Sequence, residues 1–314
     1  MVSFRFYIVS ITAVFLALAV GITMGATVID RATVELLRTQ IKTAQAQRTA
    51  TSAENKSLRK QVSDLKLSDS KIVPNLVAGA LTGVPVVIVA VQGPDIDRNV
   101  EDVTRVLTDA GATLQGQIGF TKGLRLDKGD NTVAQLAAQL NLTGSLQVDD
   151  VRKAALVKLA AWLASPPATA DAPAPGKSPL DVMKSMGLVQ QTPSMPVTAT
   201  TRFVVISSAT PDVPNEQVAG PFTSALALQS NSRVLAAEPG VNPEPDASPP
   251  VPEVREVFLA PLRADGSLKG KLSTIDNIED INGRAALVYA IRELPNTGHY
   301  GVGAHASDGP VPKS

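Results

Sequence analysis

The sequence predicts an α/β protein in which an N-terminal transmembrane helix and a coiled-coil stalk precede a mainly parallel, doubly wound domain of the Rossmann or flavodoxin kind. Three observations indicate this. The chain opens on an uncharged run from residue 6 to residue 29, a helix-forming stretch follows, and buried β-branched runs then alternate with helical patterns. We expect a signal anchor over 1–30, the stalk over 31–71, the α/β domain over 72–297 and a Gly-rich flexible tail over 298–314.

The N-terminal run is long enough to cross a bilayer. At 1.5 Å per residue it spans a hydrocarbon core of about 30 Å, and in lipid the backbone must be helical to pair its own polar groups. Arg5 and the amino terminus favour a cytoplasmic start and an extracytoplasmic α/β domain, although Arg31 weakens this bias. A cleaved signal peptide and a buried core helix are the alternatives, and the length of the run favours an uncleaved anchor in the membrane lipid.

Gly21 and Gly25 form a GxxxG pair inside this run. Glycines at this spacing let two helix backbones approach closely and gain van der Waals contacts. We therefore predict dimerisation through this face, against the alternative that small residues are simply common in membrane helices.

A heptad frame fits the stalk, which is rich in helix formers and has Pro74 as its nearest breaker. The a positions are Val34, Ile41, Arg48, Asn55 and Val62, and the d positions are Leu37, Ala44, Thr51, Leu58 and Leu65. Asn55 at an a position fixes the register of a dimer at some cost in stability. We predict a homodimer or higher homo-oligomer through the N-terminal helix and stalk, with a solvated, unpartnered helix as the alternative.

The α/β domain begins with a strand–helix–strand unit. Residues 84–91 form a continuous β-branched run, 100–107 carry valine and leucine at helical spacing before Gly111, and 112–120 form a second strand. Such a unit implies parallel strands joined by a right-handed crossover. Further strands are predicted at 201–208 and 233–237, and further helices at 151–163, 181–186 (capped by Ser178, ended by Gly187), 217–228 and 281–294.

Several function classes find no support in the residues. Acidic and basic residues cancel, which argues against nucleic acid as a partner, and the chain has no cysteine. The turn after the first strand lacks the glycine patterns of dinucleotide and P-loop sites, and no hydrolase or zinc-protease motif occurs. Asp95 and Asp97 follow that strand, where they are better explained as helix-capping and turn residues than as a ligand site. The Pro/Ala-rich insertions 165–179 and 238–252 are expected to be exposed or disordered.

The C-terminal part has the most particular sequence. LSTIDNIED over 272–280, INGRAALVYAIREL over 281–294 and GHYGVG over 298–303, together with the N-terminal VSFRFYIVSITAVFLALAVGITMG, resemble the MctB-type copper transport proteins of mycolic-acid bacteria. That family has the same order of anchor, helical stalk, α/β domain, STID-like strand and GHYG tail. The resemblance covers nearly the whole chain and implies copper efflux and resistance, an outer-membrane location and a pore.

The resemblance brings no ligand residues with it, so copper ligands must come from the residue types present. Imidazole and thioether groups suit copper, which leaves His299, His305, Met183, Met186 and Met195. Met183 and Met186 could share a helix face but are better explained by core packing, and the histidines are better explained as part of a mobile, exposed tail. The sequence identifies no certain cofactor, and copper is expected only as an ion that the protein transports.

Three functions compete at this stage. Copper transport in the cell envelope is favoured by the resemblance, and one helix per chain requires several chains for any helical pore. The alternative is a non-catalytic, membrane-anchored dimeric interaction or scaffold protein. An enzyme comes last, because no nucleophile motif is present.

Overall fold

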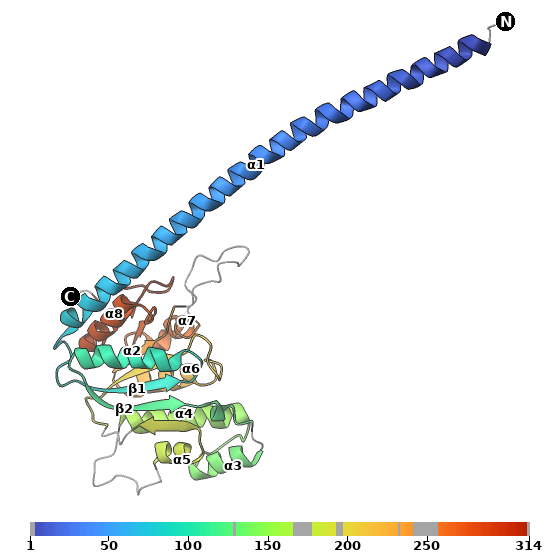
Figure 1. The fold of residues 1–314 in the computed structure, drawn as a ribbon. Coiled ribbons are helices and arrows are strands. Elements are labelled where there is room, and N and C mark those ends of the chain that lie inside the picture. The colour runs from blue at the N-terminus through green and yellow to red at the C-terminus, as the bar shows by residue number, and fades with distance from the viewer. Residues whose placement is uncertain are drawn as a thin grey trace. The chain divides into compact units, whose positions relative to one another are not determined.

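The computed structural model describes residues 4–127, 130–165, 178–192, 197–231, 233–240 and 257–312, without the side chains at 26–33, 66, 69, 70 and 130. The chain divides into two units, 1–67 and 68–314, and each is described by itself (Figure 1). Most of both insertions, and Met195, lie outside the described residues.

Helix α1, Phe4–Val77, runs through the whole first unit. Its first 22 residues, Phe4–Gly25, are long and apolar enough to cross a membrane. The hydroxyls of Thr12 and Thr23 donate to carbonyls four residues earlier, at 2.8 Å each, so these polar groups need no water. The predicted apolar N-terminal helix is confirmed.

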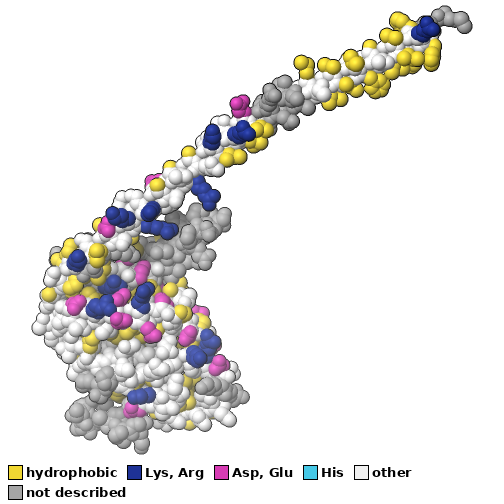
Figure 2. All heavy atoms as spheres, in the orientation of Figure 1, with side chains coloured by type: hydrophobic (Ala, Val, Ile, Leu, Met, Phe, Trp, Pro, Cys, Tyr) yellow, Lys and Arg dark blue, Asp and Glu magenta, His cyan; other side chains and the backbone are white. Residues whose placement is uncertain are grey.

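In the stalk portion of α1, the a and d residues of the heptad frame form a stripe, here called the seam, whose apolar side chains are exposed to solvent. Val34, Leu37, Ile41, Leu58, Val62 and Leu65 are all between 46% and 64% exposed. Figure 2 shows apolar side chains along the N-terminal part of α1 and basic ones spaced along the part that follows. The coiled coil itself stays a prediction, since one chain is described.

The second unit is built on one seven-stranded sheet in the order β3-β2-β1-β4-β5-β6-β7. All neighbours are parallel except the β2–β3 pair, which is antiparallel. The chain leaves β1 towards β2 and returns to its other side at β4, so the switch point lies between β1 and β4. The strands are β1 Pro85–Val91, β2 Thr113–Phe120, β3 Val189–Thr192, β4 Arg202–Ser207, β5 Val234–Ala237, β6 Leu272–Ile275 and β7 His299–Tyr300.

Helices cover both faces of the sheet, as a doubly wound fold requires (Figure 1). Helix α2 (Ile96–Asp109), α8 (Ile281–Glu293) and the last turns of α1 pack on one face. The other face carries α3 (Asp130–Gln139), α4 (Val148–Ala164), α5 (Pro179–Ser185), α6 (Ala219–Gln229) and α7 (Leu259–Ala264).

Residues of β1 divide strictly between the two cores. Val87 and Val89 point to the α4–α6 side, while Val86 and Ile88 point to the α2–α8 side, and all are at most 2% exposed. This two-sided burial explains the continuous apolar run in the sequence. Phe120 of β2 and Phe222 of α6 meet edge to face, with centroids 4.8 Å apart.

The predicted strands and helices of the α/β domain are confirmed within one to four residues at their ends. Ser178 caps α5 by accepting from the Asp181 amide at 3.1 Å, and Gly187 follows the helix with φ of +71°, both as predicted. Strands β3 and β7 and helices α3 and α7 were not predicted, because each is short or lacks a clear apolar period.

The C-terminal segment predicted as a flexible tail begins with a short strand. His299 and Tyr300 form β7, which pairs with Thr274 and Ile275 of β6. The following loop returns to the strand, because the Asp308 amide donates to the His299 carbonyl and the Gly301 amide to that of Gly309, both at 3.0 Å. His299 and Tyr300 are therefore part of the sheet, and main-chain bonds tie the following loop back to them.

Candidate functional site

The switch point between β1 and β4 is closed by side chains. The Asp95 carboxylate accepts the Ser208 hydroxyl, the Ala209 amide at 3.2 Å and the Asn99 side-chain amide at 3.2 Å. Asp95 occupies the cap position of α2 but makes no side-chain capping bond, so the capping prediction is wrong in its mechanism. Its carboxylate instead ties the loop after β4 to the start of α2, at the place where α/β proteins commonly bind ligands.

Asp97 lies beside a small hollow at the same edge of the sheet. The hollow is about 110 Å³ and is lined by glutamines, among them Gln92, Gln117 and Gln190, together with apolar residues such as Ile96 and Val100. The Gln92 amide donates to Gln190 at 3.4 Å, which links the ends of β1 and β3. No histidine or methionine lines it.

Further along this edge, carboxylates fasten the loops that follow the strands. Glu238, which follows β5 and is 1% exposed, accepts the amides of Phe258 at 2.7 Å and Leu259 at 3.2 Å. Glu279 accepts the amide of Gly240 at 2.7 Å. These acids act as loop anchors, because their oxygens are already bound by backbone donors.

Glu279 gives a testable pH effect. Burial raises the pKa of its carboxyl, with smaller raising contributions from Asp280 and Asp276 opposed by backbone hydrogen bonds. The folded state therefore disfavours the ionised form, and this penalty is full above the raised pKa and disappears below the unfolded value of about 4.5.

Glu279→Gln is expected to raise the melting temperature at pH 7, because a glutamine oxygen still accepts the Gly240 amide without the buried charge. The gain should shrink as the pH falls towards about 4.5. Thermal melts of both proteins across pH would check this, and a variant less stable than the parent at pH 7 would contradict it.

The edge at β6 and β7 holds a buried ion pair. Arg263 of α7 and Asp276 after β6 are 3% and 0% exposed and lie 3.2 Å apart. Arg263 also donates to the Thr274 hydroxyl at 2.8 Å and to the Tyr300 carbonyl at 2.7 Å. Asp276 accepts the amides of Val302 at 2.7 Å and Gly303 at 3.2 Å, so the pair fixes the loop after β7.

His299 stands next to this pair. Its Nδ1 lies 3.0 Å from the Thr274 hydroxyl, and its backbone amide donates to Asp308 at 2.7 Å. Nε2 makes no hydrogen bond within the described part of the chain. Burial lowers the pKa of the imidazole, the Arg263 charge lowers it further, and Asp308 opposes them. The ring is therefore neutral near pH 7, the form that binds metals.

The lowered pKa of His299 predicts acid sensitivity of this edge. The folded state binds the proton less well than the unfolded chain, so stability present above about pH 6.5 is lost as the pH falls below it. In His299→Gln this loss should be smaller. Thermal melts between pH 5 and 7.5 would check it, and parallel pH profiles for both proteins would count against it.

The structure separates the predicted copper ligands. Met183 is fully buried and Met186 half-buried, both on or next to α5, which packs beside β3 at one edge of the sheet. His299 belongs to β7 at the other edge, six strand spacings or roughly 25–30 Å away. His305 lies exposed in the loop after β7. Among the residues described, no three His, Cys, Asp or Glu side chains form a metal-holding group.

Sequence reasoning missed Arg263, Thr274 and Asp308, the residues around His299. Asp276 offered one signal, since an acid directly after a buried strand lies at the carboxyl edge of the sheet. Arg263 offered none, because it reaches the site from a six-residue helix without a distinctive pattern.

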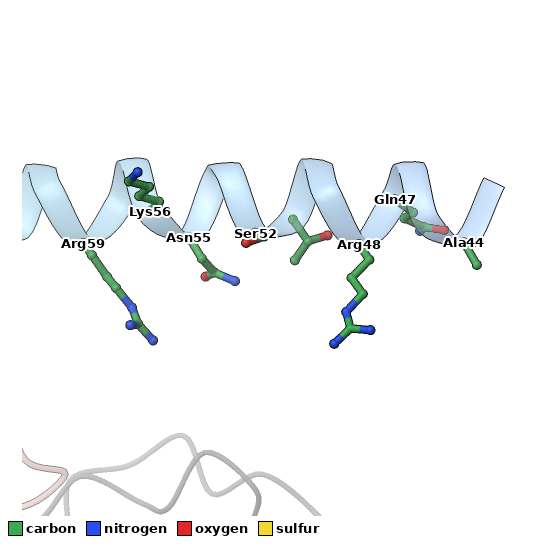
Figure 3. A pocket seen from close by; sticks show the side chains of 8 residues that line it. Ala44, Gln47, Arg48, Ser52, Asn55, Lys56 and Arg59 are labelled. Carbon is green, nitrogen blue, oxygen red and sulfur yellow. The ribbon is translucent and has the colours of Figure 1, made fainter. Parts of the chain in front are cut away.

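The predicted dimerisation residues all lie on α1. A side chain at Gly21 or Gly25 would meet nothing within 4 Å, and Asn55 is exposed. Figure 3 shows Arg48, Asn55 and Arg59 projecting to the same side of the helix. These positions are therefore accessible to a second chain.

Comparison with known proteins assigns the family. A model described as "Copper transport outer membrane protein, MctB" matches residues 1–311. The chain belongs to this family. Copper transporter MctB of Mycobacterium tuberculosis is 27% identical over 322 residues, covering 96% of this chain and 97% of that protein, and the Mycobacterium bovis protein gives the same values. Copper transporter MctB of Mycobacterium leprae is 27% identical over 335 residues, all of both chains.

The MctB match confirms the resemblance carried by the anchor, the LSTID strand and the GHYG segment. It extends through the apolar helix, the stalk and the sheet. The MctB family is described as copper transport proteins of the outer membrane, and the N-terminal helix of this chain fits a single-pass anchor.

Proposed function

We propose that this protein is a copper transport component of the cell envelope that lowers intracellular copper and contributes to copper resistance. The observation that carries the proposal is the family match over residues 1–311, supported by relatives that align from end to end. Helix α1 holds the protein in the outer membrane as a single-pass anchor, and the α/β domain lies outside the cytoplasm.

The loop after β7 is the part of the domain best suited to contact copper. Strand β7 and this loop together carry both histidines of the chain, bonds between His299 and Asp308 tie the loop back to the strand, and the Nδ1 of His299 lies beside the Thr274 hydroxyl. A neutral imidazole oriented through one nitrogen offers the other to a metal. Met183 and Met186 serve the core instead.

A pore, if the protein forms one, must be assembled from several chains. One apolar helix of 22 residues is present per chain among the residues described, and a single helix encloses no channel. Transport through such an assembly would place the anchors, rather than the sheet, around the copper path.

Growth of a deletion strain across copper concentrations tests the transport role. We expect the strain to be more copper-sensitive and to accumulate more cellular copper than its parent, and the full-length protein to restore both. Unchanged copper content and growth would favour the alternative of a membrane-anchored interaction protein.

Copper titration tests the histidines separately. We expect the full-length protein in detergent to bind copper about tenfold more weakly after His299→Ala or His305→Ala, in line with the loss of one ligand or its support. Lys269→Ala, on an exposed side chain before β6, is the matched control. Equal affinities in all four proteins would exclude the loop as a copper contact.

A further inference from the structure

We infer that α1 pairs with α1 of a second copy in a parallel, in-register, two-stranded coiled coil over residues 34–65, and that the GxxxG pair lies outside this interface. The proposal concerns assembly and does not rest on the copper function. It follows from the exposed seam, the charges beside it and the angular positions of the residues on one continuous helix.

A single helix leaves its apolar a and d residues uncovered, so this stripe of residues needs a partner. The apolar a and d residues at both ends of the seam are about half exposed on α1. A polar, unpacked helix gains little stability from propensity alone. A second copy would cover both apolar ends of the seam at once, because the a and d residues at both ends belong to one uninterrupted heptad frame and lie on the same side of the helix.

The middle of the seam limits the number of strands. Arg48 and Asn55 occupy successive a positions, and Figure 3 shows both on the side of the helix that carries the seam. In a two-stranded coil these side chains reach solvent at the edge of the interface, whereas larger bundles would enclose them. The polar layers therefore favour a dimer and one register.

Charges beside the seam select the parallel arrangement. Glu54 is at a g position and Arg59 at the following e position, so a parallel, in-register pair brings Glu54 of each chain to Arg59 of the other. Within one helix these residues are five apart and do not face each other, and neither forms an ion pair in the described residues. An antiparallel pair would instead face the e positions, which carry Arg38 and Arg59, towards each other.

The glycine pair lies on the other side of the helix. At about 100° per residue, the centre of Gly21 and Gly25 lies roughly 170° around the axis from the centre of Val34, Leu37 and Ile41. One straight helix cannot present both faces to the same partner. The dimer is therefore a property of the stalk, and any contact through Gly21 and Gly25 joins a different neighbour.

Cysteine cross-linking in native membranes tests the arrangement, because the natural chain has no cysteine. Leu58→Cys, at a d position, should give a disulfide-linked dimer as the main species after mild oxidation. Ser57→Cys, one residue away on the outer side, is the matched control and should remain monomeric. Equal linkage of both variants, or none in Leu58→Cys, would overturn the proposal.

Two further measurements keep the parts of the proposal separate. In detergent, Glu54→Arg or Arg59→Glu should lower the dimer association constant about three- to thirtyfold, and the double exchange should restore it. Gly21→Leu with Gly25→Leu should leave Leu58→Cys cross-linking unchanged. The proposal would be contradicted if the double exchange did not restore the dimer association constant, or if the two glycine substitutions abolished the Leu58→Cys cross-link. A trimer in sedimentation experiments would also contradict it.

Discussion

Arg263→Met is expected to destabilise the α/β domain by about 3–5 kcal/mol. The substitution leaves Asp276, which is fully buried, without the opposite charge 3.2 Å away. It also removes the donor to the Tyr300 carbonyl, so β7 and its return loop lose a support together with the ion pair. Because methionine keeps an apolar, unbranched stem that reaches the position of the arginine Nε, the loss reports mainly the charge and its hydrogen bonds.

Denaturant unfolding of the full-length protein in detergent would measure this loss, with hydrogen exchange at β6 and β7 locating it. Arg292→Met is the matched control: its pair with Glu293 is 41% and 34% exposed, so a change within about 1 kcal/mol is expected. If Arg263→Met and Arg292→Met were equally stable, the buried pair would not be what holds this edge.

The same ion pair shows where sequence reasoning reaches its limit. The strands β1 and β4 could be predicted because burial on both faces demands an uninterrupted apolar run, and α2 because its valines recur at helical spacing. Strand β7 has two residues, and its existence depends on Arg263, Asp276 and Asp308, which come from three separate segments. Local sequence patterns do not show which residues from separate segments come into contact in the fold.

The candidate site follows the same division. His299 could be singled out by its residue type, but its lowered pKa depends on burial and on Arg263, which only the fold brings near. The two methionines were grouped with the histidines by chemistry alone, and the strand order then placed them at opposite edges. Residue type therefore predicted the candidates, while topology decided which of them can act together.

Gly93→Ala is expected to destabilise the domain by about 1–3 kcal/mol through overpacking. A Cβ at this position would overlap the Ser208 side chain and lie 2.7 Å from the Thr210 carbonyl oxygen. The loops after β1 and β4 would have to separate, which strains the bonds from Asp95 to Ser208 and Ala209 that close the switch point.

Two companion variants make this prediction specific to the closed switch point. Gly266→Ala is the matched control, because a Cβ there meets nothing within 4 Å, and its unfolding midpoint should stay near that of the parent. Gly93→Ala combined with Ser208→Gly should recover only part of the loss, since the Thr210 carbonyl remains in place and the Asp95 contact is gone. If Gly93→Ala unfolded at the same denaturant concentration as Gly266→Ala, the two loops would have room to spare. Tight packing of Gly93 against Ser208 and Thr210 would then not be what closes the switch point, and the hydrogen bonds of Asp95 would have to close it alone.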